Sequence, residues 1–271
     1  MTNLLLAHPP ETVEGWYALH QIFRHTSESS LGHDLAPFRD PSVERDSYPQ
    51  GWTALVELIG SRADLMLVHF YPTLERIREA QSAFPLASRE TGLRPELVYS
   101  FLSVAEAGLY HITAQLAAEA VARGGEVGDE IFRAQMAERV KIESASEHLK
   151  KRLYPQVPAG MPYVCFYPMS KRRQAGQNWY TLSLEERSRL MQAHGMTGRR
   201  YAGRIQQVIT GAIGLDAWEW GVSLFAKDPL DFKKLVTDMR FDEVSAKYAD
   251  FGEFFVGKLV GVTDLGTSKR E

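Results

Sequence analysis

The C-terminal part of the chain contains a predicted helix that ends in a histidine. Ser183 and Glu186 form an S-x-x-E capping box, which predicts that the helix begins there. His194 follows Leu190 by four residues and shares its inward face, while Gly195 suits the left-handed position that ends a helix. From these residues alone, His194 either satisfies carbonyl oxygens at the helix end or presents an imidazole to a metal or haem.

A predicted strand over residues 163–167 leads into a basic segment. Alternation places Tyr163, Cys165 and Tyr167 on one face, and Pro168 is expected to end the strand. Three cations follow at Lys171, Arg172 and Arg173. The segment is either a core strand with a solvated basic turn, or a redox-capable phenol beside cations that bind an anion. Cys165 is interpreted as a packed small hydrophobe rather than a nucleophile.

A third candidate lies in the predicted strand over residues 203–210. There Ile205, Gln207 and Ile209 point the same way, so the amide shares its face with two apolar neighbours. A buried amide needs hydrogen-bond partners. Either the core or a ligand supplies them, and the sequence leaves both possibilities open.

Alternating strands and amphipathic helices surround these residues. Strands are predicted over 15–23, 64–70, 98–105, 163–167, 203–210, 218–225 and 251–260, helices over 52–60, 74–84, 184–194 and 228–239, and a loop over 26–50. Residues 64–84 and 216–241 share one pattern, an apolar strand, a turn with proline and an amphipathic helix. The repetition predicts an α+β fold of two pseudo-duplicated ferredoxin-like halves, of the dimeric α+β barrel type, with antiparallel sheets and helices outside.

We interpret the chain as three segments. Residues 1–110 form the N-terminal half, 111–151 a connecting helical or flap segment, and 152–271 the C-terminal half that carries the candidate site. The connecting segment is rich in Ala, Glu, Lys and Arg and is broken at Gly124-Gly125. It is either a covering flap or a tolerated insertion.

Composition excludes several classes of protein. The 271 residues include 31 Lys and Arg against 34 Asp and Glu, a net charge of −3, so no basic field suggests a nucleic-acid partner. One cysteine rules out an intrachain disulfide framework or a multi-cysteine metal site and fits a reducing compartment. The N-terminus lacks the pattern of a signal peptide, and no apolar run is long enough to span a membrane. We therefore expect a cytoplasmic protein.

Seven motifs in the C-terminal half occur in a characteristic order. They lie at residues 165–173 (CFYPMSKRR), 178–180 (NWY), 194–195 (HG), 201–203 (YAG), 216–221 (DAWEWG), 239–248 (MRFDEVSAKY) and 254–257 (FFVG). Together they resemble the coproheme decarboxylases, peroxide-dependent haem b synthases of the chlorite dismutase-like superfamily. The resemblance is dense over 152–260 and thinner over 15–105.

The resemblance implies a role for individual residues. His194 matches the histidine that binds the porphyrin iron, and Tyr167 matches the tyrosine that becomes the oxidising radical. Lys171 matches a lysine near the reacting propionate, and Gln207 matches the distal glutamine. Three further positions resemble propionate-binding residues or a wall of the pocket: Arg152, Ser245 and Met169.

The resemblance also implies a reaction and an assembly. Iron-coproporphyrin III (coproheme) would be both substrate and redox centre, and hydrogen peroxide would drive loss of carbon dioxide from two propionates, leaving the vinyl groups of haem b. The family further implies a homopentamer.

One position separates this activity from that of chlorite-degrading relatives. Those relatives place an arginine where this chain has Gln207, and a cation there would stabilise an anionic oxychlorine ligand far better than an amide does. Arg204 is expected on the opposite strand face. A haem-binding peroxidase or chlorite dismutase-like protein, and a haem carrier, remain the alternatives.

Overall fold

The structure is a computed structural model that describes residues 8–25, 50–90 and 95–263. Most of the loop predicted over 26–50 lies outside these residues. The strands are β1 Thr12–His25, β2 Trp52–Leu58, β3 Leu65–Tyr71, β4 Pro95–Gly108, β5 Tyr163–Lys171, β6 Ile205–Gly211, β7 Trp220–Ala226, β8 Ala249–Phe251 and β9 Phe255–Thr263. The helices are α2 Leu74–Glu90, α3 Tyr110–Ala122, α4 Glu130–Ser144, α5 Glu147–Leu153, the 3₁₀ turn η3 Trp179–Thr181, α6 Leu184–Arg199, α7 Leu230–Arg240 and α8 Glu243–Tyr248.

The strands form a closed antiparallel ring. Their order is β7-β6-β4-β1-β3-β2-β9-β5-β8, and an additional pairing of β7 with β5 closes the ring and leaves β8 attached to β5 alone. Strands β1 to β4 come from the N-terminal half, and β5, β6, β7 and β9 come from the C-terminal half. The halves meet at two seams, β4–β6 and β2–β9. The predicted duplicated α+β fold is confirmed.

The inside of the ring is a continuous apolar core with one histidine. Phe70, Phe101, Phe166 and Phe225 are fully buried there. His20 stacks on Phe166 with ring centroids 3.9 Å apart, and its Nε2 lies 2.8 Å from the Ser223 hydroxyl. Burial, assisted by His69, lowers the pKa of His20 to about 3, so this histidine is neutral and belongs to the core.

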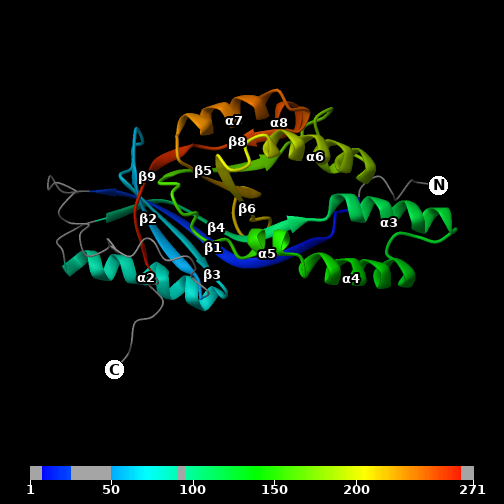
Figure 1. Cartoon of the computed structure of the whole chain (residues 1–271), viewed down its shortest axis with the longest axis horizontal. Coiled ribbons are helices and arrows are strands. Elements are labelled where there is room, and N and C mark those ends of the chain that lie inside the picture. The colour runs from blue at the N-terminus through cyan, green and yellow to red at the C-terminus, as the bar shows by residue number, and fades with distance from the viewer. Residues whose placement is uncertain (1–7, 26–49, 91–94, 264–271) are drawn as a thin grey trace.

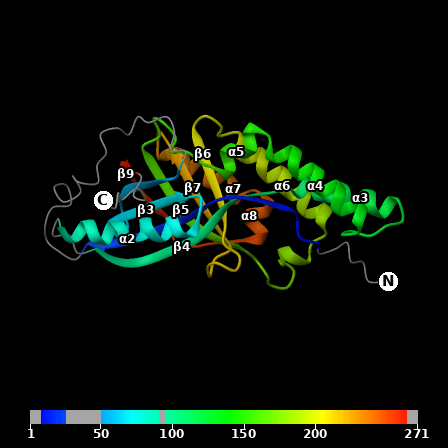
Figure 2. The same ribbon diagram turned by 90° about the horizontal axis from the view of Figure 1, so that it is seen from below.

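The helices pack outside the ring on two sides. In Figure 1, α6, α7 and α8 lie along one side of the sheet, and α2 lies on the other. Helices α3 and α4 extend from one end beside α6, as the view from below also shows (Figure 2). An apolar cluster joins α3 and α4 to the first residue of α6, with Leu116, Phe132, Met136 and Leu184 buried in it. The 111–151 segment therefore packs against the helix that carries His194.

The helix predicted over residues 52–60 is wrong. These residues form β2, which pairs with β3 on one side and β9 on the other. Residues 52–56 are buried without alternation because one face of β2 lines the core and the other is covered outside the ring. A short, continuously apolar run does not distinguish such a strand from a buried helix.

Two predicted ends are also wrong. Strand β5 runs through Pro168 to Lys171. It pairs with β9 before Pro168 and with β8 after it. The Pro168 carbonyl accepts from Gly252 N at 2.9 Å, and the N–H that proline lacks is not needed because neither neighbouring strand pairs with Pro168 on that edge. Helix α6 begins at the predicted Ser183 cap, whose hydroxyl accepts from Glu186 N, but it continues past Gly195 to Arg199.

Candidate active site

The outer face of β6, β7 and β5 forms the floor of the candidate site. Register places Tyr167 opposite Val222 and Met169 opposite Trp220, and on the next strand Gln207 opposite Leu224. Directly opposite residues of an antiparallel pair share a face. The structure therefore brings three residues singled out from the sequence, Tyr167, Met169 and Gln207, onto one surface.

Tyr167 is an almost fully buried phenol within this surface. Its ring stacks on Phe254 with centroids 4.3 Å apart and contacts Phe251 at 6.0 Å. Burial raises the pKa of Tyr167, assisted by Cys165 and opposed by the Arg240 guanidinium. The side chain is therefore a neutral phenol held in a rigid aromatic setting, and it retains the hydroxyl hydrogen that radical formation would release.

His194 is fixed by a carboxylate from a distant part of the chain. Its Nδ1–H donates to Asp242 Oδ2 at 2.6 Å, an assignment that follows because an ionised carboxylate only accepts. The imidazole side chain is 29% exposed, and Nε2 is left as the nitrogen able to bind a metal. A carboxylate on the far nitrogen fixes the tautomer and increases the basicity of a metal-binding histidine.

Asp242 serves two structural purposes. It is the N-cap of α8, and its Oδ2 accepts from the backbone N–H and the hydroxyl of Ser245, both at 3.3 Å. Burial works against its ionisation, but hydrogen bonds from His194 and Ser245 hold the pKa of Asp242 below its usual range. The carboxylate that orients His194 is thus anchored by the first turn of α8, and Ser245 is tied to the same group.

Helix α6 lies directly over the floor. Gly198, one turn beyond His194, comes so close that a Cβ there would stand 3.3 Å from Gln207 Nε2 and 3.4 Å from Met239 Cε. The missing side chain at Gly198 therefore lets α6 approach the strand that carries Gln207. Helix α6, which carries His194, thus packs over the strand face that holds Tyr167 and Gln207.

Lys171 lies at the end of β5 as a buried cation. Its Nζ stands 4.4 Å from the centre of the Trp179 ring, and the side chain is only 8% exposed. Burial lowers the pKa of Lys171 to about 8, against the opposing attraction of Asp242 and Glu219. Since Asp242 also holds His194, one carboxylate connects two residues that the sequence analysis proposed separately.

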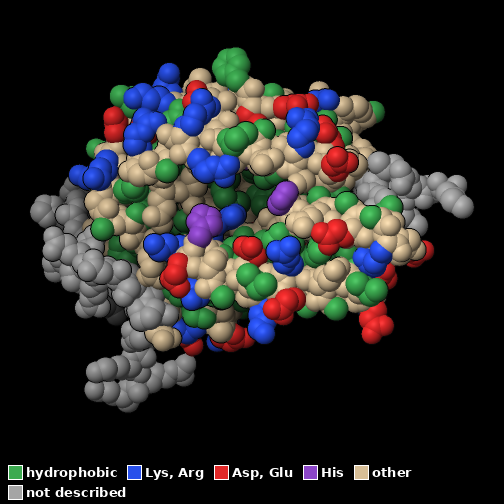
Figure 3. Space-filling model, turned by 45° about the vertical axis from the view of Figure 1, so that its right-hand side comes forward, with side chains coloured by type: hydrophobic (Ala, Val, Ile, Leu, Met, Phe, Trp, Pro, Cys, Tyr) green, Lys and Arg blue, Asp and Glu red, His purple; other side chains and the backbone are tan. Residues whose placement is uncertain are grey.

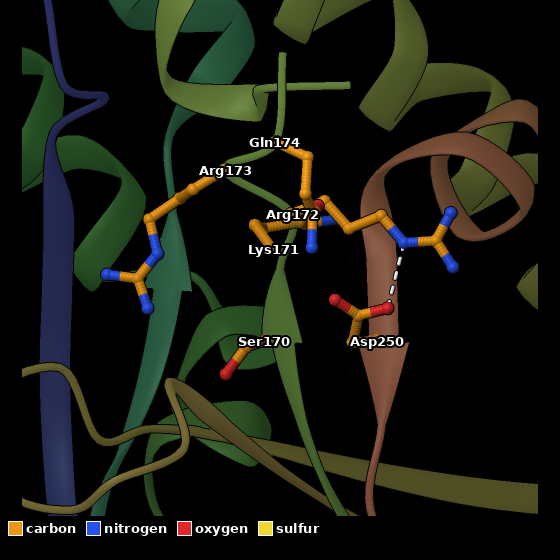
Figure 4. Close-up of a pocket in the computed structure, with 6 residues that line it drawn as sticks. All are labelled: Ser170, Lys171, Arg172, Arg173, Gln174 and Asp250. Atoms are coloured by element: carbon orange, nitrogen blue, oxygen red, sulfur yellow. Dashed lines mark hydrogen bonds and ion pairs between the residues drawn. The ribbon is translucent and has the colours of Figure 1, made fainter. Parts of the chain in front are cut away.

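Two small cavities adjoin this end of β5. One of about 350 Å³ is lined by Ser170, Lys171, Arg172, Arg173, Gln174 and Asp250 (Figure 4). The other, of about 450 Å³, is lined by Arg172, Arg240, Ser245, Ala246, Ala249, Asp250 and Phe251. Arg172 Nε donates to Asp250 Oδ1 at 2.8 Å on the boundary between the two. Cations outnumber the single carboxylate, so both cavities suit carboxylate substituents of a ligand.

Arg152 approaches the site from a different element. It lies in α5, which packs against β4, the strand that carries Glu106. Burial lowers the pKa of the Arg152 guanidinium, and the Glu106 carboxylate opposes this. Figure 3 shows a hollow in one face of the molecule, with hydrophobic side chains inside it and histidine and basic side chains at its rim.

Several residues of the site were missed by the sequence analysis. Asp242 and Arg240 flank Phe241 between α7 and α8, and the Arg240 guanidinium lies 3.7 Å from the centre of the Phe251 ring. Glu219 Oε2 accepts from Lys171 N at 2.7 Å. The available signals are the motif at residues 216–221, which contains Glu219, and the motif at residues 239–248, which contains Arg240 and Asp242.

The role of Asp242 leads to a first prediction. Asp242→Asn keeps a good N-cap for α8 but removes the negative charge beside His194, so the fold should persist while the bond between His194 and a porphyrin iron weakens. We expect a lower iron–histidine stretching frequency in resonance Raman spectra of the ferrous coproheme complex and about 10-fold weaker coproheme binding. Asp242→Ala is the control, because it removes both the charge and the N-cap of α8 and should therefore also lower the melting temperature of the protein. An unchanged frequency in Asp242→Asn would contradict this role.

Within the described residues, no group of three or more His, Cys, Asp or Glu side chains could hold a metal ion. A bare metal centre built from several protein ligands is therefore not found there, whereas a single histidine is the protein contribution that a haem iron requires. Across the same residues, no helix is long and apolar enough to cross a membrane.

The chain is similar to known proteins over most of its length. The chlorite dismutase family matches residues 39–260. A curated coproheme decarboxylase from Thermus thermophilus is 38% identical over 260 residues, which cover 92% of each chain. Another from Staphylococcus saprophyticus is 37% identical over 266 residues, covering 94% of this chain and 96% of the relative.

Solved structures give the same result. A heme-binding protein from Thermus thermophilus superposes with a TM-score of 0.69 at 37% identity, covering 93% of this chain and 94% of the other. A mutant chlorite dismutase from Candidatus Nitrospira defluvii shares the fold, with a TM-score of 0.58, 19% identity and coverage of 91% and 92%. The match to the family over most of the chain, and the identity to its coproheme decarboxylases, show that this chain belongs to the chlorite dismutase family.

Proposed function

We propose that this protein is a coproheme decarboxylase that uses hydrogen peroxide to convert two propionates of iron-coproporphyrin III into vinyl groups, giving haem b. The observation that carries the proposal is the pairing of two walls: His194, oriented by Asp242, lies on α6 above the strand face that holds buried Tyr167. Relatives at 37–38% identity are named coproheme decarboxylases.

The chain's own residues fit this substrate. His194 Nε2 would bind the iron, and when bound the iron supplies the reaction with peroxide. Tyr167 would give one electron and its phenolic proton to the oxidant that peroxide and the bound iron supply, and would regain both as a hydrogen atom from the β-carbon of a propionate. A second electron taken by the same oxidant would release carbon dioxide and leave the vinyl group. Lys171 would hold the reacting carboxylate, and its pKa near 8 lets it give or take a proton close to neutral pH.

The remaining propionates have candidate partners at the rim. Ser245 and the cations around the two cavities offer hydrogen-bond donors on one side, and Arg152 offers a guanidinium on the other. Met169 would form the wall between them, since it lies on the floor two residues after Tyr167.

The amide of Gln207, which matches the distal glutamine of the family, favours decarboxylation over chlorite degradation. Gln207 lies on the floor, and the nearest cation in sequence, Arg204, is held elsewhere: its Nη1 donates to Asp231 Oδ1 at 2.8 Å, and its guanidinium lies over Tyr201. Gln207 therefore offers a neutral amide rather than a guanidinium to a molecule bound on that side.

A direct test is to load the purified protein with coproheme, titrate it with hydrogen peroxide, and follow porphyrin mass by chromatography. We expect stepwise loss of two carboxyl groups through a three-propionate species. Binding without any loss of mass would instead indicate a haem carrier, and rapid bleaching with turnover of a reducing co-substrate would indicate a peroxidase.

We further propose that the subunit assembles into a homopentamer in the cytoplasm. Exposed apolar side chains such as Ile213 and Phe241, which are 62% and 87% exposed, offer surface that an interface would cover. Multi-angle light scattering at several concentrations should give about five times the mass of one chain. A mass near 30.6 kDa throughout would contradict the assembly.

A further inference from the structure

Strand β5 loses one of its two neighbours before it ends. Its pairing with β7 stops at Met169, which lies opposite Trp220, whereas its pairing with β8 continues through Ser170 to Lys171. Figure 4 shows Ser170 and Lys171 at this end of β5, beside Asp250 of β8. The edge of β5 that paired with β7 therefore needs other partners for its backbone groups, because a buried N–H without an acceptor is unfavourable.

Glu219, the residue before β7, supplies those partners. Its Oε2 accepts from Lys171 N at 2.7 Å. Its own backbone N–H donates to Met169 O at 3.1 Å and to the Ser170 hydroxyl at 3.2 Å, and its carbonyl accepts from Ala212 N at 2.8 Å, just after β6. Glu219 is buried. One buried residue thus holds three consecutive residues of β5 where the pairing with β7 has ended.

The position of the Lys171 side chain depends on this part of the backbone. Alternation along β5 places Tyr167, Met169 and Lys171 on one face, so the lysine ends the row that contains the phenol. Lys171 Nζ stands 4.4 Å from the centre of the Trp179 ring, and it forms no hydrogen bond or ion pair with the residues that the structure describes. The four-carbon stem is flexible, so the place of the ammonium follows from where the backbone of Lys171 is held.

We propose that Glu219 is a positioning residue for Lys171: its carboxylate takes the place of a strand neighbour, fixes the end of β5, and so sets where the Lys171 ammonium meets a carboxylate of the substrate. The inference rests on the proposed function, in which Lys171 holds the reacting propionate. The other carboxylate oxygen of Glu219, Oε1, lies 3.9 Å from Arg173 Nη2, so both oxygens are directed at the segment that ends β5. Glu219 acts through the backbone of Lys171 and is not itself a catalytic residue.

The test measures binding of iron-free coproporphyrin III, by its own fluorescence, at pH 7.0, below the pKa of Lys171 at about 8. Glu219→Ala leaves the buried Lys171 N–H without its acceptor, and we expect affinity to fall by about tenfold or more, the scale of a hydrogen bond to a charged group. Glu219→Gln is the matched control, since its amide oxygen still accepts from Lys171 N, and it should bind within about threefold of wild type. Amide hydrogen exchange at residues 170–172 should become faster in Glu219→Ala and not in Glu219→Gln.

Substitution of Lys171 decides whether Glu219 acts through it. In a Lys171→Met background, Glu219→Ala should change affinity by less than about twofold, because the group that Glu219 positions is gone. The full loss in that background, an affinity unchanged by Glu219→Ala, or a Glu219→Gln variant as weak as Glu219→Ala would each overturn the inference.

Glu219→Asp replaces Glu219→Ala if the alanine variant does not fold. Its carboxylate is one methylene short of Lys171 N, so it keeps the charge but loses the hydrogen bond, and affinity should fall in the same way. Wild-type affinity in Glu219→Asp would contradict the positioning role. Because the probe contains no iron, these results are independent of whether coproheme is decarboxylated, which tests the proposed function separately.

Discussion

Tyr167→Phe should bind coproheme and yield neither the three-propionate species nor haem b. Phenylalanine keeps the ring that stacks on Phe254, so stability should change by less than about 1.5 kcal/mol. It removes the phenolic hydrogen, without which the ring does not readily form the neutral radical. We therefore expect decarboxylation to fall below detection. Chromatography with mass detection after peroxide titration measures this.

Tyr163→Phe is the control, because Tyr163 shares the strand and the face of Tyr167 but lies opposite Ala226, whereas Tyr167 lies opposite Val222. It should retain activity. Haem b formed by Tyr167→Phe at the wild-type rate would move the radical to another residue, with Tyr163 and Tyr180 as the candidates. Accumulation of the three-propionate species would mean that Tyr167 serves only one propionate.

His194→Ala should remove the protein ligand of the iron. Among the described residues, His194 is the histidine whose Nδ1 is tied to a carboxylate and whose Nε2 has no protein partner, so the five-coordinate histidine signature of the bound ferric porphyrin should be lost. Decarboxylation should fall below detection, while porphyrin binding persists in part through the propionates. Absorption and electron paramagnetic resonance spectra report the ligand directly.

Added imidazole supplies the control for this variant. It should restore a nitrogen-ligated spectrum in His194→Ala because the side chain it replaces is partly open to solvent. A five-coordinate histidine signature that survives the substitution without imidazole would place the ligand at another residue.

Much of the fold could be predicted because its signals are local. The two strand–turn–helix units at residues 64–84 and 216–241 are β3 with α2 and β7 with α7, and their repetition identified the duplication. Strand β2 was not predictable in the same way, because a strand buried on both faces has no alternation to detect. The extension of β5 past Pro168 depends on which strands flank it, which is a property of the whole sheet.

The candidate site was predictable where one residue carries the signal. His194, Tyr167 and Gln207 were singled out in their own segments, and the resemblance implied their roles. The structure places Tyr167 and Gln207 on one strand face and brings α6, the helix with His194, against Gln207 at Gly198.

The carboxylate that orients His194 was not predictable, because Asp242 is 48 residues away in sequence. Glu106, which accepts from Trp220 at the edge of the floor, is likewise 114 residues from its partner. Partners of this kind become visible only when register and helix packing are known.

The two seams of the ring differ in length, so the halves of the chain are held together by more backbone pairing at β2–β9 than at β4–β6. At β2–β9 the halves pair from Thr53–Thr263 to Leu58–Gly257, whereas at β4–β6 they pair only at Val104–Gly211 and Ala105–Thr210. Local opening begins where backbone bonds are fewest, and that short seam borders the floor. A ligand that extended across the floor to Arg152 would contact both halves of the chain and would oppose opening of the β4–β6 seam. Such a ligand would slow amide hydrogen exchange in β4 and β1, strands of the half that does not contain its iron ligand.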